Sequence, residues 1–333
     1  MDFDLTIAWA AIILFAVFAY VVMDGFDLGI GILFRALQPG EERDQAMNTV
    51  APVWDGNETW LVLGGGGLMA AFPLAFAVIM TAVYPPIIAM LLALVFRGVA
   101  FEARWRDPSH RAWWDAAFHG GSTVAALAQG IILGALLQGI TVQGREYAGG
   151  WWDWLTPFSL LTGLSVVAGY ALLGAGWLIL KTSGTVQVRA KKLAPWLLGA
   201  MLLGILAVSL ATIGLDFDYH QRWTAYPTVL WTAQVPLLTA IISYAFWRAL
   251  RRGRELAPFL LGLSLFALTF LGLCISMFPY VVPQALTVYD AASPDSSLGF
   301  MLIGALILVP VILAYTTWSY WVFRGKVGDE GYH

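Results

Sequence analysis

Long apolar runs, each about 20 residues or more with few charges, recur along almost the whole chain of 333 residues. An α-helix needs about 20 apolar residues to cross the hydrocarbon core of a bilayer. Only 12% of the residues are charged, whereas about a quarter are charged in a soluble domain. The sequence therefore predicts an all-α polytopic transmembrane helix bundle of about nine spans. The predicted spans are residues 6–34, 53–72, 75–100, 114–139, 157–180, 196–215, 225–248, 257–282 and 299–322.

The second predicted span is the least apolar, because it contains Asp55, Asn57 and Glu58. The basic residues support it, since Lys and Arg collect in loops on the cytoplasmic side of a membrane. With the N-terminus outside, the inside loops and the C-terminal tail contain 16 of the 18 Lys and Arg residues. The outside loops then contain only Arg145 and Arg222. Removing the second span destroys this alternation, so we predict an outside N-terminus and an inside C-terminus.

The loops are short, so we expect residues 1–333 to form a single membrane domain. Residues 1–140 would form a first four-helix group with nearly all of the intramembrane charge. Residues 157–282 would form a second four-helix group, and span 299–322 would be a peripheral ninth helix. We expect no cleavable signal peptide, because the first six residues carry two acids and no base. No basic patch for nucleic acid and no zinc-ligand spacing is present in the sequence.

Ionisable residues gather inside the first four spans. Each costs about 2.5–3.5 kcal/mol on insertion scales, and such residues usually face a bundle interior or water. Asp24 and Asp27 are three residues apart and share a helix face, as do Asp55 and Glu58. The predicted orientation places the whole group in the cytoplasmic half of the membrane. The candidate proton-pathway residues are Asp55, Glu102, Asp27, Asp24, Glu58 and His119, with Arg97 as their charge partner.

Buried carboxylates can exchange protons near neutral pH, so this group suits proton uptake from the cytoplasm. A structural role stays open beside it. Asp24 or Asp27 could simply neutralise Arg97, and Asp55 could cap the start of its helix. His119 is the one histidine inside a predicted span, and we expect a core or pathway residue rather than a haem ligand. We predict no metal site in this chain.

Three segments carry a family resemblance: DGFDLG at residues 24–29, NTVAPVWDGNETWL at 48–61 and FRGVAFE at 96–102. In the fourth predicted span, Gly121-Ser122, Gln129-Gly130 and Leu137-Gln138-Gly139 add to it. Together these motifs resemble subunit II of the cytochrome bd-type quinol oxidases, including the cyanide-insensitive branch. The motifs cover roughly the first 140 residues, and the length and span count of the remainder agree with the family.

The resemblance implies a heterodimer with a homologous subunit I, which carries the b- and d-type haems and the quinol-oxidising site. It implies that the complex oxidises quinol, reduces dioxygen to water and takes protons from the cytoplasm. Asp55 and Glu102 match family acids proposed on the path toward the oxygen-reducing haem, and Asp27 matches an acid on the neighbouring helix. Some members have Asp where this chain has Glu102. Some members also bind a structural quinone in subunit II, and the resemblance leaves room for a small single-span accessory subunit.

We therefore expect a required subunit of a quinol:dioxygen oxidoreductase in the bacterial cytoplasmic membrane. Its partners would be subunit I and membrane lipids, and it would not bind nucleic acid. We expect no catalytic residue in this chain and assign no cofactor ligand to it. One alternative is a stand-alone proton-coupled transporter, which would place charges in corresponding parts of two inverted halves. A second alternative is a purely structural scaffold subunit.

Overall fold

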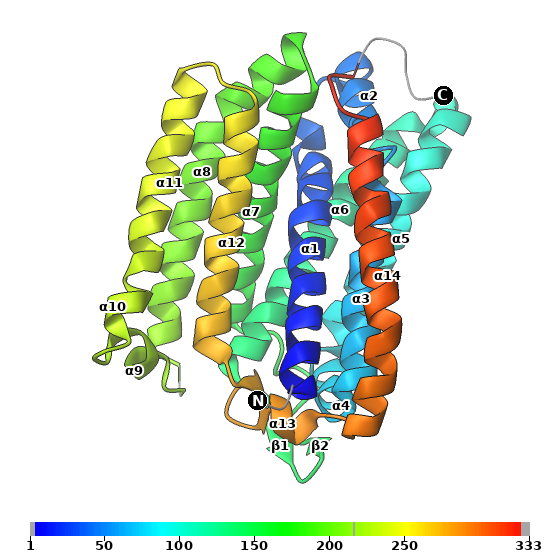
Figure 1. Cartoon of the computed structure of the whole chain (residues 1–333). Helices are drawn as coiled ribbons and strands as arrows, with labels where there is room; N and C mark the ends of the chain where they lie inside the picture. Colours follow the sequence, from blue (N-terminus) through cyan, green and yellow to red (C-terminus); the bar gives the residue numbers. More distant parts are fainter. Residues whose placement is uncertain (1–3, 216, 328–333) are drawn as a thin grey trace.

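The computed structural model describes residues 4–215 and 217–327, and long antiparallel helices dominate it (Figure 1). The first half contains α1 (Leu5–Leu33), η1 (Phe34–Ala36), α2 (Glu41–Asn48), α3 (Trp54–Ala71), α4 (Pro73–Ala82), α5 (Tyr84–Arg106), η2 (Pro108–His110) and α6 (Arg111–Gln138). A small antiparallel hairpin of β1 (Val142–Gln143) and β2 (Glu146–Tyr147) follows.

The second half contains α7 (Pro157–Lys181), α8 (Gly184–Ile213), α9 (Tyr219–Thr224), α10 (Val229–Thr232), α11 (Gln234–Arg251) and α12 (Leu256–Met277). A second hairpin pairs β3 (Tyr280–Val282) with β4 (Leu286–Thr287). The chain ends with α13 (Val288–Ala291) and α14 (Asp295–Val322).

The number of membrane-length helices agrees with the sequence prediction. In the described residues, 8 helices are long and apolar enough to cross a membrane. A ninth span is counted if α3 and α4, which are bent by 120° at their junction, are taken together. The predicted all-α bundle of about nine spans is therefore confirmed.

Several predicted span boundaries are wrong, and prolines explain the start of the third span. The third span does not start at residue 75, because α4 forms a separate helix and α5 starts at Tyr84. Proline lacks the N–H that continues a helix and is tolerated in the first turn, where Pro73 of α4 and Pro85 of α5 lie. The helix of the sixth span starts at Gly184 rather than at residue 196, and that of the eighth ends at Met277, after which the chain enters β3.

The helix α1 is central and joins the two halves (Figure 1). It packs against α3 and α6 on one side and against α7 on the other. The contact with α7 is made between backbones, since a Cβ on Gly29 would lie 1.9 Å from the carbonyl oxygen of Tyr170. Close approach of this kind is typical of small residues at helix interfaces in membranes. The largest buried cluster of apolar residues accordingly draws on helices of both halves.

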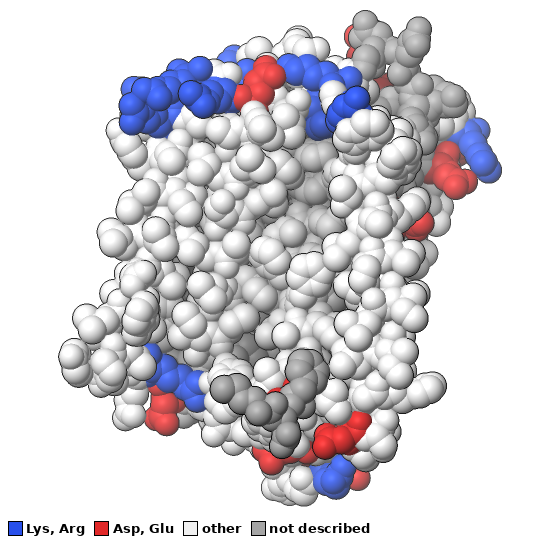
Figure 2. Space-filling view, in the orientation of Figure 1, with Lys and Arg blue, Asp and Glu red and all other residues white. Residues whose placement is uncertain are grey.

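The charged residues are concentrated at the two ends of the bundle, and few of them lie on the long side between the ends in this view (Figure 2). Lys and Arg dominate the end at which α5, α7 and α11 finish, and we call this the basic end. α1 begins at the opposite end (Figure 1). α14 is only 11% buried over its most apolar window, so most of its surface is open in the isolated chain.

The residues after α14 form a strap that returns to the second half. The Lys181 ammonium donates to the carbonyl oxygen of Phe323 over 2.5 Å, and the Val327 N–H donates to the carbonyl oxygen of Lys181 over 2.9 Å. Lys326 forms an ion pair of 2.9 Å with Glu255. The strap therefore ties the end of α14 to the end of α7 and to the start of α12.

Candidate functional site

Arg97 of α5 lies at the centre of the buried polar site. Its side chain is 0% exposed. The neighbouring helix α6 approaches α5 here at backbone level. A Cβ on Gly121 would lie 2.6 Å from the carbonyl oxygen of Ala93 and 3.1 Å from the backbone nitrogen of Arg97. A guanidinium removed from water in this way requires acidic partners.

Three carboxylates supply them. Arg97 Nη1 lies 2.9 Å from Asp24 Oδ1 and 2.5 Å from Glu58 Oε1, and Nη2 lies 3.7 Å from Asp27 Oδ2. Both aspartates are 0% exposed, and Glu58 is 23% exposed. We call these four residues the Arg97 cluster. Three carboxylates against one guanidinium would give a net charge of −2 if all were ionised, so binding a proton would reduce the excess charge.

Amide and hydroxyl groups extend the Arg97 cluster toward α14. The Asn57 side-chain amide donates to Asp27 Oδ2 over 2.7 Å, and the Tyr320 hydroxyl donates to Asn57 Oδ1 over 2.8 Å. Beside them, a cavity of about 20 Å³ lies between α3 and α14, with Thr316 and Ser319 also in its wall. A polar cavity of this size holds about one water molecule. The α3–α14 contact is thus polar where it meets Asp27.

A second set of hydrogen bonds continues from α1 toward α7. The Gln129 amide donates to the Tyr20 hydroxyl over 2.8 Å and accepts from the Tyr170 hydroxyl over 2.6 Å. Tyr20 lies one helical turn from Asp24 on the same helix, and both tyrosines are buried. The two amide atoms of Gln129 are therefore both occupied, which fixes its orientation between α1 and α7.

Aromatic rings cover the Arg97 cluster. Trp54 and Phe101 stack with their ring centroids 4.7 Å apart and an interplanar angle of 8°. The Arg97 guanidinium carbon lies 5.9 Å from the Trp54 centroid and 5.8 Å from the Phe101 centroid. Cation–π contacts of this length add to the stabilisation of a desolvated arginine.

Sequence reasoning missed a second ion-pair cluster at the basic end. Arg104 of α5, 0% exposed, lies 2.5 Å from Asp115 Oδ1 and 2.8 Å from Asp44 Oδ1. Arg43 pairs with Asp115 over 2.7 Å, and Arg111 pairs with Asp44 over 2.5 Å. These residues lie at predicted span edges and in loops, where charge is ordinary, so the sequence offered no signal. The cluster fixes α2 against α5 and α6.

Of the predicted site residues, Asp24, Asp27, Glu58 and Arg97 are brought together, and the other three are not. Asp55 is exposed on the outer face of α3. Glu102 is 73% exposed and pairs over 3.4 Å with Arg106 on its own helix. His119 Nδ1 lies 2.9 Å from the carbonyl oxygen of Gly31, away from the carboxylates.

The described residues show no metal site. Among them, no group of three or more His, Cys, Asp and Glu side chains could hold a metal ion. One ring nitrogen of His119 is engaged by the backbone, and His110 and His220 are exposed.

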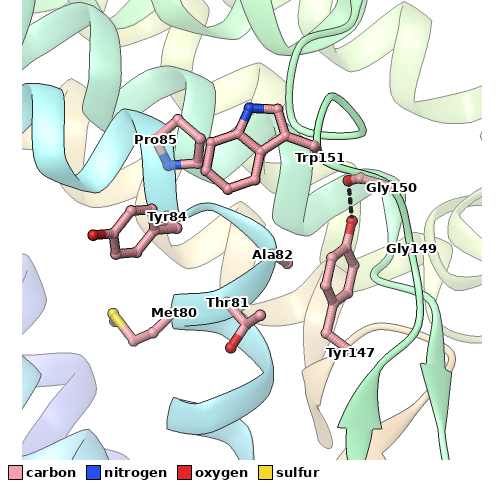
Figure 3. Close-up of a pocket in the computed structure, with 9 residues that line it drawn as sticks. All are labelled: Met80, Thr81, Ala82, Tyr84, Pro85, Tyr147, Gly149, Gly150 and Trp151. Carbon is pink, nitrogen blue, oxygen red and sulfur yellow. Dashed lines mark hydrogen bonds between the residues drawn. The ribbon is translucent and has the colours of Figure 1, made fainter.

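An open pocket of about 340 Å³ lies at the other end of the bundle, between the α4–α5 junction and the segment after β2 (Figure 3). Tyr84 and Trp151 form part of its wall, and the Tyr147 hydroxyl donates to the carbonyl oxygen of Gly150 over 2.7 Å. Burial, and then a hydrogen bond with Asp153, raises the pKa of Tyr147 to about 12. Tyr147 therefore stays protonated near neutral pH, and the pocket wall offers no charged group for catalysis.

Comparison with known proteins shows the family and the fold of this chain. Residues 5–323 match the family described as cytochrome bd terminal oxidase subunit II. The chain belongs to this family. It is 30% identical to the cytochrome bd-I ubiquinol oxidase subunit 2 of Escherichia coli K12, with 99% of this chain and 97% of that protein covered. It is 31% identical to the cytochrome bd ubiquinol oxidase subunit 2 of Bacillus subtilis 168, with 97% and 96% covered.

A solved structure supports the same fold. The structure of bd oxidase from Geobacillus thermodenitrificans contains a chain that matches with a TM-score of 0.76. The sequence identity is 17%, and 96% of this chain and 98% of that chain are covered. The family resemblance drawn from the sequence motifs is thus confirmed. A subunit II of a bd oxidase implies a partner subunit I and haems in the complex.

Proposed function

We propose that this chain is the haem-free subunit II of a bd-type quinol:dioxygen oxidoreductase of the bacterial cytoplasmic membrane. It supports the homologous subunit I, which carries the b- and d-type haems and oxidises quinol. It also provides part of the route by which protons reach the site of dioxygen reduction. The proposal assigns no quinone and no accessory subunit to this chain.

The Arg97 cluster is the observation that carries the proton role. It holds three carboxylates against one guanidinium inside the bundle, and hydrogen bonds link Asp27 through Asn57 to Tyr320. A site with more acidic than basic groups can bind a proton and release it again. The basic residues at the nearby end of the bundle favour a cytoplasmic location, because Lys and Arg collect on that side.

The outer faces of α3 and α5 are suited to contact with a partner subunit. Asp55 is exposed in the first turn of α3, and Glu102 is exposed near the end of α5. Charged side chains in a membrane span face protein or water rather than lipid. Adding a Cβ to Gly65 or Gly66 of α3 would meet no atom within 4 Å, so α3 offers a flat surface to another helix. We propose that subunit I covers this face, so that Asp55 and Glu102 line the subunit boundary.

One observation favours a purely structural scaffold instead: the Arg97 cluster joins α1, α3 and α5. The two functions differ in what conservative substitutions do. The test uses the complex copurified with this chain, carrying Asp27→Asn, Asp55→Asn or Glu102→Gln. The matched control is Glu146→Gln, which changes an exposed acid at the opposite end.

We expect each of the three variants to keep the haem spectrum and to lower quinol-driven dioxygen consumption by about tenfold or more, because a positioned proton-transfer group contributes about 10²–10⁴-fold. Proton uptake in proteoliposomes should fall in parallel, and Glu146→Gln should change neither. Unchanged turnover in all three variants would refute the proton role. Loss of turnover together with loss of haem would support the scaffold instead. Proton transport by this chain without subunit I would favour the transporter.

A further inference from the structure

Four arginines lie around the turn between α11 and α12 and form no ion pair with any described residue: Arg248, Arg251, Arg252 and Arg254. They differ in this from five of the six arginines in residues 1–140. Arg43, Arg97, Arg104, Arg106 and Arg111 each have an acidic partner within 4 Å. All four unpaired arginines are exposed. We call them the arginine arc.

The backbone holds the arginine arc in a defined shape. The Arg254 N–H donates to the carbonyl oxygen of Ala249 over 3.1 Å, and the Gly253 N–H donates to that of Leu250 over 3.0 Å. This pair of bonds is a Schellman motif, which needs a left-handed residue after the helix. Gly253 supplies it with a φ of +68°. The four side chains therefore project from a fixed turn rather than from a loose loop.

An apolar stripe leads up to the arginine arc along the outer face of α11. Leu237, Ile241 and Tyr244 are exposed by 60%, 54% and 60% and follow one another at three- and four-residue spacing. Arg248 continues the same line. At its end, the Arg251 guanidinium carbon lies 4.4 Å from the centroid of the Trp247 ring. The surface thus changes from aliphatic to aromatic to cationic toward the basic end.

The nearest acid does not neutralise the arginine arc. Glu255 follows it directly in the chain but pairs with Lys326 over 2.9 Å and with Lys191 over 3.9 Å. Hydrogen bonds from Lys326 and Gln187 lower the pKa of Glu255, so it stays ionised and engaged by those cations. The arc therefore keeps its positive charge. α11 also lies on the side of the bundle away from α5 and α14 (Figure 1), and Figure 2 shows the basic corner above it.

We propose that this corner binds an anionic phospholipid. The phosphate would lie against the arginine arc, and the acyl chains would lie along the apolar stripe of α11. Basic residues at the ends of transmembrane helices on the cytoplasmic side are suited to anionic headgroups. A zwitterionic lipid offers the same phosphate but adds a cation that the arc repels. The occupant is therefore defined by its net negative headgroup, and the site is independent of the proton route.

The test compares lipid binding by the purified complex in detergent, using native mass spectrometry during titration with phosphatidylglycerol or phosphatidylcholine. The variant Arg251→Gln/Arg252→Gln removes two charges of the arc. The control Arg106→Gln/Arg324→Gln removes two charges from the same end, where Arg106 is already paired and Arg324 stacks on Trp321. A third variant, Arg251→Lys/Arg252→Lys, keeps the charge.

We expect the wild-type complex and the lysine variant to retain phosphatidylglycerol preferentially. The glutamine variant of the arc should bind it roughly 30-fold more weakly, equal to about 2 kcal/mol, because each basic residue near an anionic surface contributes about 1 kcal/mol. The control pair should bind like the wild type. Equal retention of both lipids by the wild type, or equal weakening in the control pair, would overturn the proposal. The exposed arc can be altered without touching the core, and an unchanged haem spectrum will verify assembly.

Discussion

Gly120 and Gly121 are neighbours on α6, yet replacing each by alanine should have different effects. A Cβ at Gly121 would lie 2.6 Å from the carbonyl oxygen of Ala93 and 3.1 Å from the backbone nitrogen of Arg97. A Cβ at Gly120 would meet no atom within 4 Å. Favourable contacts between heavy atoms need about 3.5–4.0 Å, so Gly121→Ala must separate α5 from α6 by roughly 1 Å.

The free-energy difference between the two variants can be estimated. Forcing extra atoms into a packed interface costs about 1–3 kcal/mol. Alanine favours a helix over glycine by about 1 kcal/mol, but both variants gain this equally. Gly121→Ala should therefore be about 1–3 kcal/mol less stable than Gly120→Ala. The displaced backbone includes the nitrogen of Arg97, so the ion pairs of Arg97 with Asp24 and Glu58 should also lengthen.

Thermal unfolding of the purified complex measures the stability difference between Gly121→Ala and Gly120→Ala. A change of 1 kcal/mol moves the midpoint by about 2–4 °C in domains of 150–250 residues, so we expect Gly121→Ala to unfold about 2–12 °C below Gly120→Ala. Dioxygen consumption should fall in Gly121→Ala and stay near the wild-type rate in Gly120→Ala. Equal midpoints for the two variants would refute the close approach of α5 and α6.

Two further predictions concern ionisable groups. Arg97→Gln leaves Asp24 and Asp27 without their countercharge and should destabilise the chain by about 3–5 kcal/mol. Adding Asp24→Asn to this variant should restore part of the lost stability. Equal unfolding midpoints for the single and the double variant would contradict this prediction. Because the folded pKa of Tyr147 is raised to about 12, its stabilisation should be present below the ordinary tyrosine value of 10.0 and be lost as the pH rises through about 12. The difference in tyrosinate absorbance between the wild type and Tyr147→Phe should titrate with a midpoint near pH 12. A midpoint near pH 10.0 would argue against the burial of Tyr147 and its bond to Asp153.

Hydropathy was sufficient to predict the helices, because a bilayer requires long apolar segments wherever the chain crosses it. The helix breaks were less accessible, since Pro73 and Pro85 are tolerated inside some membrane helices and end others. Which outcome occurs depends on neighbouring helices that can satisfy the freed backbone groups. The bend of 120° between α3 and α4 was therefore visible only in the structure.

The charged site was predictable as a group of residues but not as an arrangement. Glu102 follows Arg97 by five positions, and five residues turn an α-helix by about 140° beyond one full rotation, which places the two side chains on different faces. This rotation could have been worked out from the spacing alone. Asn57 and Tyr320 meet only because α14 returns to α3. No local pattern in the sequence indicates a contact between residues so far apart.

The strap formed by Phe323, Lys326 and Val327 bears on how the protein is made. α14 leaves the ribosome after all the other helices that the structure describes, and little of its surface is buried against them. Its anchor points, Lys181 and Glu255, belong to helices that have been inserted earlier. The strap can therefore form only after residue 327 has been synthesised, and a ribosome that stops before residue 323 would release a chain whose α14 keeps contacts with α1 and α3 but lacks the strap.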